Sequence, residues 1–383
     1  MNDIKYIAFY LPQYHCFPEN DEWWGKGFTE WTNVKKAKQY FKWQDQPRRP
    51  LNNNYYDLDK DFDQTIHWQI SLAKEYGIYG FCFYHYWFKG GKVLMQKPVE
   101  RYLSDNTCEL PFCISWANEP WTRAWDGKNK QVIMPQEYGG PKEWEEHFYY
   151  LLPYFRDTRY ICKDGQPVIV IYRPEIIDEL DNMLSLWKEL AVKEGLGGLC
   201  VMSQSSIYAT TTGYRKSNFI DYRILYEPGV TQAQFSVLRG NVFQKFIHNP
   251  VIFTTFQMQK AKRVLGKLIP FSKSYFNTTI WDYDLFWKVI LNRKYEKDDW
   301  IPGAFIDWDN TPRRGAKNGR LFKGATPEKF AKYMTQLVKK VRTETQHGFI
   351  FIDAWNEWCE GTYLEPDEKN GYGYLEGIRQ SLL

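Results

Sequence analysis

Short, almost continuously apolar segments recur along the chain, separated by longer segments with helical periodicity. Apolar runs of this length that are rich in β-branched and aromatic residues are typical of parallel strands buried on both faces. Eight such runs lie at Tyr6–Leu11, Ile78–Tyr84, Pro111–Trp116, Val168–Tyr172, Leu199–Ser203, Ile220–Tyr226, Ala304–Asp307 and Phe349–Ala354. The pattern therefore predicts eight buried strands.

The segments between these runs carry apolar side chains at helical spacing. Clear stripes run over Phe62–Ala73, Leu180–Ala191 and Phe330–Val341. Gly77 and Gly195 follow the first two stripes as stop signals, and Thr326 with Pro327 precedes the third as its cap and first turn. Alternating strands and helices predict an α/β fold, a single (β/α)8 TIM barrel that takes up residues 1–383 as one domain.

A doubly wound parallel sheet is the alternative α/β architecture. Sheets of that kind bind nucleotides at a glycine-rich turn after the first strand. The first predicted strand is instead followed by Pro12-Gln13-Tyr14-His15, which contains no glycine. We therefore favour the barrel.

One segment departs from this rhythm, between the sixth and seventh predicted strands. From Pro228 to Trp281 there is no Asp or Glu, whereas seven Lys and Arg residues alternate with apolar residues. The favoured interpretation is an elaborated loop with a solvated basic face, since isolated basic patches are common. The alternative is a surface that meets anionic lipid or an anionic glycan.

Composition narrows the class of protein further. The chain has 383 residues, a formal net charge of +4 and 17 Trp, 28 Tyr and 25 Phe. This aromatic content argues against disorder, and the small net charge argues against general nucleic-acid binding. No run approaches the roughly 20 apolar residues of a membrane span, and no secretion signal precedes the first strand. Seven scattered cysteines indicate reduced thiols. We expect a cytoplasmic protein, with 228–281 as the one candidate contact with the inner membrane face.

Polar and aromatic side chains gather where the predicted strands end, which is where a barrel of this kind carries its active site. Aromatic rings stack on the apolar faces of sugars, and carboxylates or amides bind the hydroxyls, so the pattern indicates a sugar site. The candidate substrate-binding residues are Tyr10, His15, His85, Tyr86, Trp87, Trp116, Asn118, Glu119, Tyr172, Tyr226, Asp307, Asp309, Arg313, Trp355, Asn356 and Trp358.

Two glutamates after the eighth strand are the catalytic candidates. Glu357 and Glu360 are three residues apart, so one helical turn would bring their Cβ atoms to about 5–6 Å. Two carboxyls this close cannot both ionise freely, which supplies the acid and the base that glycosidic cleavage requires. A capping pair at the start of the next helix is the structural alternative. Glu119 is a second candidate, either as an acid/base opposite a nucleophilic Glu357 or as a turn residue.

Asp307 and Asp309 suggest another chemistry. An Asp-x-Asp pair can bind Mg²⁺ or Mn²⁺ in nucleotide-sugar transferases, but the motif is common by chance, and Arg313 and Arg314 could neutralise it. The histidines have no ligand spacing; His15 and His85 could hydrogen-bond substrate hydroxyls. We expect neither a metal nor another cofactor.

The longest motifs resemble a known family. Residues 7–15 (Ile-Ala-Phe-Tyr-Leu-Pro-Gln-Tyr-His) and 23–31 (Trp-Trp-Gly-Lys-Gly-Phe-Thr-Glu-Trp) resemble the start of the WbsX family. Members of this family carry a domain like glycoside hydrolase family 99 and are often encoded in O-antigen and capsule gene clusters. The resemblance continues through 80–88, 116–125, 303–314 and 355–366.

The segment 356–362, followed by Glu365 and Pro366, is similar to the catalytic signature of the family 99 endo-α-mannosidases. Those enzymes are retaining (β/α)8 hydrolases that work through a 1,2-anhydro sugar. The resemblance implies that Glu357 deprotonates the sugar 2-hydroxyl and that Glu360 is the acid/base on the glycosidic oxygen. It makes Glu119 a substrate-binding residue. Cys359 stands where the hydrolases typically carry His, which leaves the substrate open.

Taken together, these patterns predict a carbohydrate-active enzyme whose partner is an oligosaccharide or polysaccharide. We expect a retaining glycoside hydrolase or transglycosidase that acts on α-linked, mannose-like polysaccharide or lipid-linked oligosaccharide in O-antigen or capsular polysaccharide metabolism. The WbsX family has commonly been labelled glycosyltransferase from its gene context, so a glycosyltransferase of lipopolysaccharide O-antigen or capsule biosynthesis is one alternative. A non-catalytic glycan-binding protein is the other.

Overall fold

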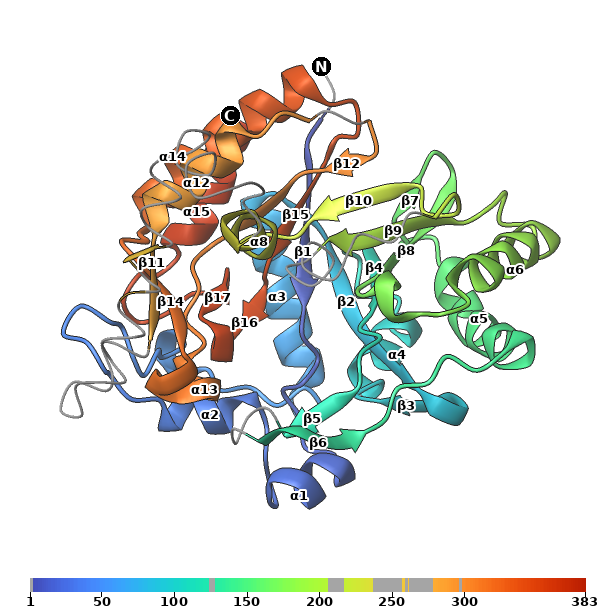
Figure 1. Ribbon diagram of the computed structural model, residues 1–383, viewed down its shortest axis with the longest axis horizontal. Coiled ribbons are helices and arrows are strands. Elements are labelled where there is room, and N and C mark those ends of the chain that lie inside the picture. Colours follow the sequence, from blue (N-terminus) through green and yellow to red (C-terminus); the bar gives the residue numbers. More distant parts are fainter. Residues whose placement is uncertain are drawn as a thin grey trace.

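The computed structural model describes residues 3–123, 128–205, 217–236, 257–258, 261, 278–295 and 298–383. Its centre is a ring of parallel strands with helices packed outside it (Figure 1). The strands of the ring are β1 (Lys5–Tyr10), β2 (Ile78–Phe88), β4 (Phe112–Trp116), β8 (Gln166–Ile171), β9 (Cys200–Ser205), β10 (Tyr222–Leu225), β12 (Trp300–Ile301), β13 (Gly303–Phe305) and β15 (Phe349–Asp353). The predicted α/β barrel is confirmed.

The ring closes through a strand that is split in two. Hydrogen bonds join the strands in the order β12-β10-β9-β8-β4-β2-β1-β15-β13. Only Pro302 separates β12 from β13, and this one stretch therefore reaches both β10 and β15. A Cβ atom on Gly303 would lie 1.9 Å from the carbonyl oxygen of Leu225, so the close approach of the two strands requires glycine there.

The split strand is also where the sequence pattern was least accurate. The seventh predicted run, Ala304–Asp307, begins four residues after β12 starts and extends past Phe305, the end of β13. Pro302 has no N–H to donate, so it interrupts the hydrogen bonding of the strand and divides it into two short pieces. Its carbonyl nevertheless accepts a bond of 3.0 Å from the Phe351 amide. The other seven predicted runs each overlap one strand of the ring, with ends that differ by up to four residues.

Helices cover the outside of the ring. They are α3 (Phe62–Tyr76), α4 (Lys97–Ser104), α5 (Pro141–Phe155), α6 (Leu180–Lys193), α12 (Tyr283–Asn292), α14 (Pro327–Glu344) and α15 (Gly373–Leu382). The three predicted stripes correspond to α3, α6 and α14. Gly77 ends α3 in the left-handed conformation (φ 86°), and the Thr326 side chain accepts a bond from the Lys329 amide at the start of α14.

Shorter elements extend the connections between strands and helices. They are α1 (Pro18–Trp24), α2 (Glu30–Lys36), β3 (Lys92–Leu94), β5 (Trp121–Arg123), β6 (Lys128–Met134), β7 (Cys162–Lys163), α8 (Gly229–Ser236), β11 (Thr279–Asp282), α13 (Thr311–Asn318), β14 (Arg320–Lys323), β16 (Asn356–Glu357) and β17 (Thr362–Tyr363), with 3-10 turns η1 (Leu51–Asn53), η2 (Lys89–Gly91), η4 (Pro174–Ile176) and η6 (Trp358–Glu360). In Figure 1, α2, α13 and the β5–β6 hairpin lie toward the ends at which β1 and β2 point.

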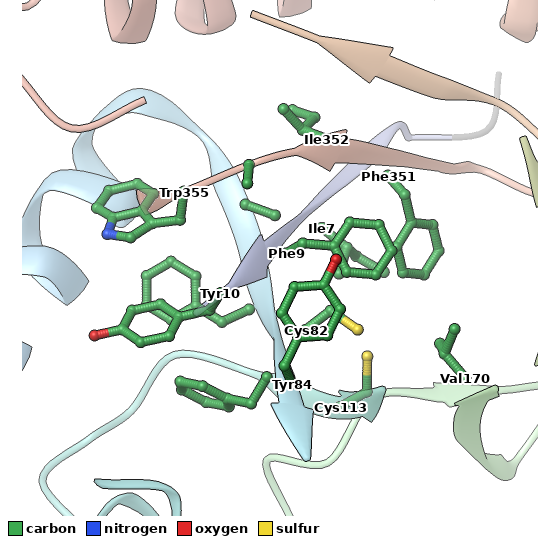
Figure 2. Close-up of a cluster of buried hydrophobic side chains, with 14 of the residues drawn as sticks. Ile7, Phe9, Tyr10, Cys82, Tyr84, Cys113, Val170, Phe351, Ile352 and Trp355 are labelled. Carbon is green, nitrogen blue, oxygen red and sulfur yellow. The ribbon is translucent and has the colours of Figure 1, made fainter. Parts of the chain in front are cut away.

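Aromatic side chains fill the inside of the barrel (Figure 2). Phe9 of β1 stacks on Tyr84 of β2, with ring centroids 5.6 Å apart and planes inclined by 14°. The ring of Tyr226 meets Phe9 edge-on at 5.3 Å, and Phe351 of β15 lies at 5.5 Å. Because a strand alternates its side chains between two faces, Tyr10 points the other way, toward α3. The core thus reaches Tyr84 within β2 and Tyr226 directly after β10.

The seven basic residues of segment 228–281 lie outside the described residues, so the structure does not test the interpretations of that surface. Among the helices that are described, none is long and apolar enough to span a membrane.

Candidate active site

A cavity of about 360 Å³ opens where the barrel strands end. Its lining comes from the segments that follow most strands of the ring and from α1, α13, β11 and β14. The aromatic lining residues are Trp24, Tyr84, Tyr86, Trp121, Tyr172, Tyr226, Trp281, Trp308 and Phe322. The charged lining residues are Glu119, Arg313, Arg314, Arg320, Glu357 and Glu360.

The two catalytic candidates lie on opposite ends of one turn at this cavity. Glu357 ends β16, and Glu360 ends the 3-10 turn η6 that follows. Side chains three residues apart overlie one another in a 3-10 turn, so both carboxyls face the same side. Neither caps a following α-helix, because α15 begins only at Gly373.

One arginine joins the two glutamates. Arg313, from α13, donates from Nη2 to Oε2 of Glu357 at 3.2 Å and from Nη1 to Oε1 of Glu360 at 2.8 Å. The same Nη2 also donates to Oε1 of Glu30 at 2.9 Å. Glu30 is fully buried at the start of α2. One cation therefore faces three carboxyl groups, and the site carries an excess of acid.

The electrostatics of this cluster favour a proton on Glu357. Burial raises the pKa of Glu357 to about 8. Arg313 opposes this increase, whereas the nearby charges of Glu360 and Glu30 add to it. Groups with such shifts are typical of acid–base sites, although structural ion pairs produce them too.

Hydrogen bonds to the end of β1 fix the position of β16. Asn356 accepts from the Leu11 amide at 2.8 Å and donates to the Leu11 carbonyl at 3.0 Å, which reproduces a strand pairing with a side chain. The Tyr14 hydroxyl donates to the Asn356 carbonyl. Asn356 is fully buried and does not line the cavity, so it supports the segment that carries Glu357.

Trp358 anchors the turn from the other side. Its indole stacks on Tyr363, with centroids 3.7 Å apart, and donates to Oε2 of Glu365 at 2.6 Å. Glu365 also accepts bonds from Gln69 at 2.7 Å and Tyr56 at 3.1 Å. Burial raises the pKa of Glu365 to about 7. This cluster lies behind the carboxyl pair and does not reach the cavity.

The end of β2 divides its side chains between the cavity and the helices. Tyr84 and Tyr86 line the cavity, whereas His85 and Trp87 point toward α5. Nε2 of His85 lies 3.0 Å from Nε2 of His147, whose ring stacks on Trp87 at 4.4 Å. Burial lowers the pKa of His85 to about 3, so both partners in this pair are neutral at pH 7.

Other predicted site residues are also packed away from the cavity. Tyr10 donates to Gln69 of α3, His15 bonds the Pro12 carbonyl, and Trp355 packs on Phe81. Trp116 donates to the Trp87 carbonyl at 3.1 Å. These side chains support the barrel wall rather than face the cavity.

Asp307 and Asp309 have partners within the protein. Asp307 bonds Arg48 at 2.6 Å, and that arginine also donates to the Gly361 carbonyl. Asp309 accepts from the amides of Gln44 at 2.8 Å and Gln46 at 3.1 Å. The Asp-x-Asp pair thus fastens the 44–48 segment beneath the site, and neither carboxylate lines the cavity.

Glu119 lies on the cavity wall, where an amide and an arginine position it. Asn118 exchanges two hydrogen bonds with the backbone of Arg173, at 2.9 and 2.7 Å. Arg173 in turn reaches Glu119 at 3.4 Å and Glu175 at 2.8 Å. Burial raises the pKa of Glu119, and Arg173 opposes that increase.

Several residues of the site were not predicted from the sequence. Glu30 lies within the 23–31 motif, and the signal for its burial is a lone acid directly before Trp31 at the start of a helix. Trp281, Arg320 and Phe322 come from the short strands β11 and β14, which have no clear periodicity.

A metal ion could be held elsewhere in the described part of the chain. Ligand atoms of His67, Asp105 and Cys108 all lie within 4.8 Å of one another. None of the three lines the cavity, so this group is separate from the site.

A parallel barrel with aromatic walls and paired carboxyls at its strand ends fits the class of carbohydrate-active enzyme families. Comparison with protein families agrees: the family described as Glycosyltransferase WbsX matches residues 6–378. The chain belongs to this family.

Two curated relatives come from Xanthomonas campestris pv. campestris, strains B100 and ATCC 33913, and both are described as "Uncharacterized protein WxcX". They are 31% and 32% identical to this chain over 382 residues, or 98% of its length. The chain spans about half the length of these relatives, since the match covers 49% of each.

Among solved structures, one described as "Glycoside hydrolase-like protein" matches with a TM-score of 0.54 at 13% identity. The match covers 100% of this chain and 94% of that one, and it supports the barrel fold alone. The GH99 endo-alpha-mannosidase from Bacteroides thetaiotaomicron matches at a TM-score of 0.49 and 12% identity, covering 100% and 96% of the two chains.

Proposed function

We propose that this protein is a retaining glycoside hydrolase or transglycosidase that acts on α-linked, mannose-like polysaccharide or lipid-linked oligosaccharide. The observation that carries the proposal is the shared contact of Glu357 and Glu360 with Arg313 at the cavity. Two carboxyls beside a linkage are what glycosidic cleavage requires. The aromatic lining provides flat apolar surfaces for sugar rings.

In the proposed first step, Glu357 takes the proton of the sugar 2-hydroxyl. That oxygen attacks the anomeric carbon while the bond to the leaving oxygen breaks, and Glu360 gives its proton to the leaving oxygen. Water or an acceptor hydroxyl then opens the 1,2-anhydro sugar, losing its proton to Glu360 as Glu357 returns a proton to O2. Two inversions at one carbon give net retention.

The raised pKa of Glu357 has a consequence for this chemistry. With a pKa of about 8, Glu357 is mostly protonated in the free protein at pH 7 and becomes a competent base as the pH rises. The same high pKa makes the ionised group a stronger base toward a hydroxyl. In this proposal Glu119, held by Arg173, binds a substrate hydroxyl and takes no proton from it.

The description of the family as a glycosyltransferase favours a second candidate function. A metal-dependent nucleotide-sugar transferase would use Asp307 and Asp309 as ligands, but these carboxylates are bonded to Arg48, Gln44 and Gln46. We therefore rank it second. Thermal-shift measurements with nucleotide sugars and Mn²⁺ discriminate the two: stabilisation by a donor would favour the transferase.

The direct test uses Glu357→Gln and Glu360→Gln, with Glu344→Gln on the surface of α14 as the matched control. Each protein is incubated with α-mannans and with bacterial O-antigen and capsular polysaccharides, and products are followed by reducing-end assay and mass spectrometry. We expect the wild type and the control to form product and both site variants to lose it while staying folded. Unchanged turnover in either site variant contradicts the proposal, as does glycan binding without product in the wild type.

We separately propose that segment 228–281 contacts an anionic membrane surface and that the protein is located in the cytoplasm. Support comes only from the seven basic residues and the lack of acidic ones in that segment. Pelleting with phosphatidylcholine vesicles, with and without phosphatidylglycerol, tests it. Binding that requires phosphatidylglycerol supports the contact, and equal recovery in both supernatants contradicts it.

A further inference from the structure

A group of three different side chains lies on the outer layer of the barrel, away from the cavity. His67 is on α3, Asp105 directly follows α4, and Cys108 is in the connection to β4. Their ligand atoms are one nitrogen, one oxygen and one sulfur, and all lie within 4.8 Å of one another. None of the three residues lines the cavity, so the proposed chemistry does not use them.

The carboxylate of Asp105 lies between the other two side chains. Its Oδ2 is 3.6 Å from Sγ of Cys108 and 3.8 Å from Nε2 of His67. Tetrahedral Zn²⁺, with bonds of about 2.3 Å to sulfur and about 2.1 Å to nitrogen and oxygen, holds the sulfur about 3.6 Å and the nitrogen about 3.4 Å from the oxygen. The two separations in the protein match these values to within a few tenths of an ångström.

The connection that carries two of these side chains is held in place by its own hydrogen bonds. Oδ1 of Asp105 accepts from the Thr107 amide at 2.9 Å and from the Thr107 hydroxyl at 2.5 Å, which leaves Oδ2 directed at the other ligand atoms. The Arg159 guanidinium donates to the carbonyls of Asp105 at 2.7 Å and Cys108 at 2.8 Å. Asp105 and Cys108 are thus positioned without a metal ion.

The burial of the three residues suits a metal site that is open to solvent on one side. Cys108 is fully buried, whereas the side chains of Asp105 and His67 are 24% and 43% exposed. An ion can therefore enter from solvent, and water can supply a fourth ligand. The separation between sulfur and nitrogen is at most 4.8 Å, and the exposed His67 side chain has room to shorten it.

The mixture of ligand types selects the kind of ion. Mg²⁺ and Ca²⁺ prefer oxygen ligands throughout, whereas imidazole together with thiolate favours Zn²⁺. In the free protein the Cys108 thiol donates to Oδ2 of Asp105, and burial raises the pKa of this thiol to about 12. A bound Zn²⁺ takes the place of the thiol proton, which passes to solvent.

We propose that His67, Asp105 and Cys108 form a Zn²⁺ site that joins α3 to the connection between α4 and β4, with water as the fourth ligand. The ion would cross-link two elements of the outer layer and stabilise the folded protein. This site is independent of the proposed function, because it lies apart from the cavity.

Co²⁺ and Zn²⁺ are the probes, added to the full chain after treatment with EDTA and a phosphine reductant. Tetrahedral Co²⁺ gives intense visible absorption, and a thiolate ligand adds a charge-transfer band in the near ultraviolet. The variants are Cys108→Ser, His67→Gln and Asp105→Asn, the last of which keeps the oxygen that accepts from Thr107. Cys162→Ser, which removes an exposed cysteine outside the group, is the matched control.

We expect the wild type and the control to bind one Co²⁺ per chain with both absorption features, and Zn²⁺ to displace it. Cys108→Ser should lose the charge-transfer band, and His67→Gln and Asp105→Asn should each weaken binding about tenfold or more. A hundredfold excess of Zn²⁺ over its dissociation constant should raise the Tm of the wild type and the control by about 4 °C, and Mg²⁺ should not.

Three results would overturn the site. They are the absence of both absorption features in the wild type, a charge-transfer band that persists in Cys108→Ser, and metal binding that His67→Gln and Asp105→Asn leave unchanged. Because these measurements need no glycan, their outcome does not depend on whether the protein cleaves one.

Discussion

The buried carboxylate of Glu30 lies 2.9 Å from the guanidinium of Arg313, the same group that bonds both glutamates at the cavity. Glu30 sits at the start of α2, far from Glu357 in sequence, and its Oε2 has no hydrogen-bond partner among the described residues. The charge of Glu30 adds to the increase in the pKa of Glu357, and Arg313 opposes it. The Glu30–Arg313 pair thus adjusts the proton affinity of the candidate base.

This arrangement predicts pH shifts of opposite sign. If Glu357 acts as a base, kcat/KM rises with pH as Glu357 ionises, toward a plateau above about 8 that ends where the acid Glu360 loses its proton. Glu30→Gln removes a negative charge, lowers the pKa of Glu357 and moves the rise to lower pH. Arg313→Met removes the positive charge, moves the rise to higher pH and lowers the plateau about 100-fold or more, since it also loosens both carboxyls. Measuring kcat/KM between pH 5 and 10 checks both.

The matched control is Arg156→Met, in which a surface ion pair with Glu194 is lost. Arg156→Met should leave the dependence of kcat/KM on pH the same as in the wild type. If Glu30→Gln and Arg313→Met shift the profile in the same direction, Glu30 acts through folding and not through charge.

Protein stability should also depend on Glu357 and pH. Its pKa is about 8 in the folded protein against 4.5 ordinarily, so the fold favours the protonated form. As the pH rises from 4.5 to 8, the unfolded chain releases this proton and the folded chain retains it, and stability is lost over that window. Glu357→Gln cannot ionise and should gain, relative to wild type, of the order of 4 kcal/mol between pH 5 and pH 8.5.

Urea unfolding at the two pH values measures the difference. Glu365, whose pKa is raised to about 7, contributes a loss of the same sign in both proteins and cancels in the comparison. A stability gap between wild type and Glu357→Gln that is constant with pH would contradict the raised pKa.

The bonds between Asn356 and Leu11 should be a large local contribution to stability. Asn356→Ala leaves a buried amide and a buried carbonyl without partners, which costs about 2–4 kcal/mol. Asn318→Ala, at an exposed end of α13, should change stability by less than about 0.5 kcal/mol. Urea unfolding midpoints check both values, and a near-neutral Asn356→Ala would contradict the role of this amide.

Arg48 and Asp307 offer a test of the structural role of the Asp-x-Asp pair. Arg48→Met leaves a buried carboxylate uncompensated and should cost about 3–5 kcal/mol. Adding Asp307→Asn to Arg48→Met should recover part of that loss, because it removes the unpaired charge. Thermal unfolding measures both variants. Equal stability of the single and double variants would show that the pair is not coupled.

Strand positions were predictable because the ring strands are buried on both faces, and few other segments are as continuously apolar as Tyr6–Leu11. Helix ends followed from local signals such as Gly77 and Thr326. The split at Pro302 could not be predicted from the sequence. Only the strand pairing in the folded protein shows that β12 pairs with β10 while β13 pairs with β15.

The site was only partly predictable, for a similar reason. Placement at strand ends found Glu119, Arg313, Glu357 and Glu360, which do line the cavity. It also included His85 and Trp87, but β2 continues to Phe88, and alternation along it turns these two side chains away from the cavity that Tyr84 and Tyr86 line. Partners that are far apart in the sequence could not be predicted from residue spacing. The Gln44 side chain, for example, donates a hydrogen bond to Asp309, which is 265 positions away.

The roles of Glu357 and Glu360 are tested most directly by their dependence on the leaving group. Wild type, Glu357→Gln and Glu360→Gln are compared on an α-mannoside with a sugar leaving group and on the 4-nitrophenyl analogue, whose leaving oxygen needs no proton. The account predicts that Glu360→Gln loses turnover of the first and keeps much of its turnover of the second, while Glu357→Gln loses both. Two results would contradict these roles. One is that Glu357→Gln retains turnover of both substrates, and the other is that Glu360→Gln loses turnover of both.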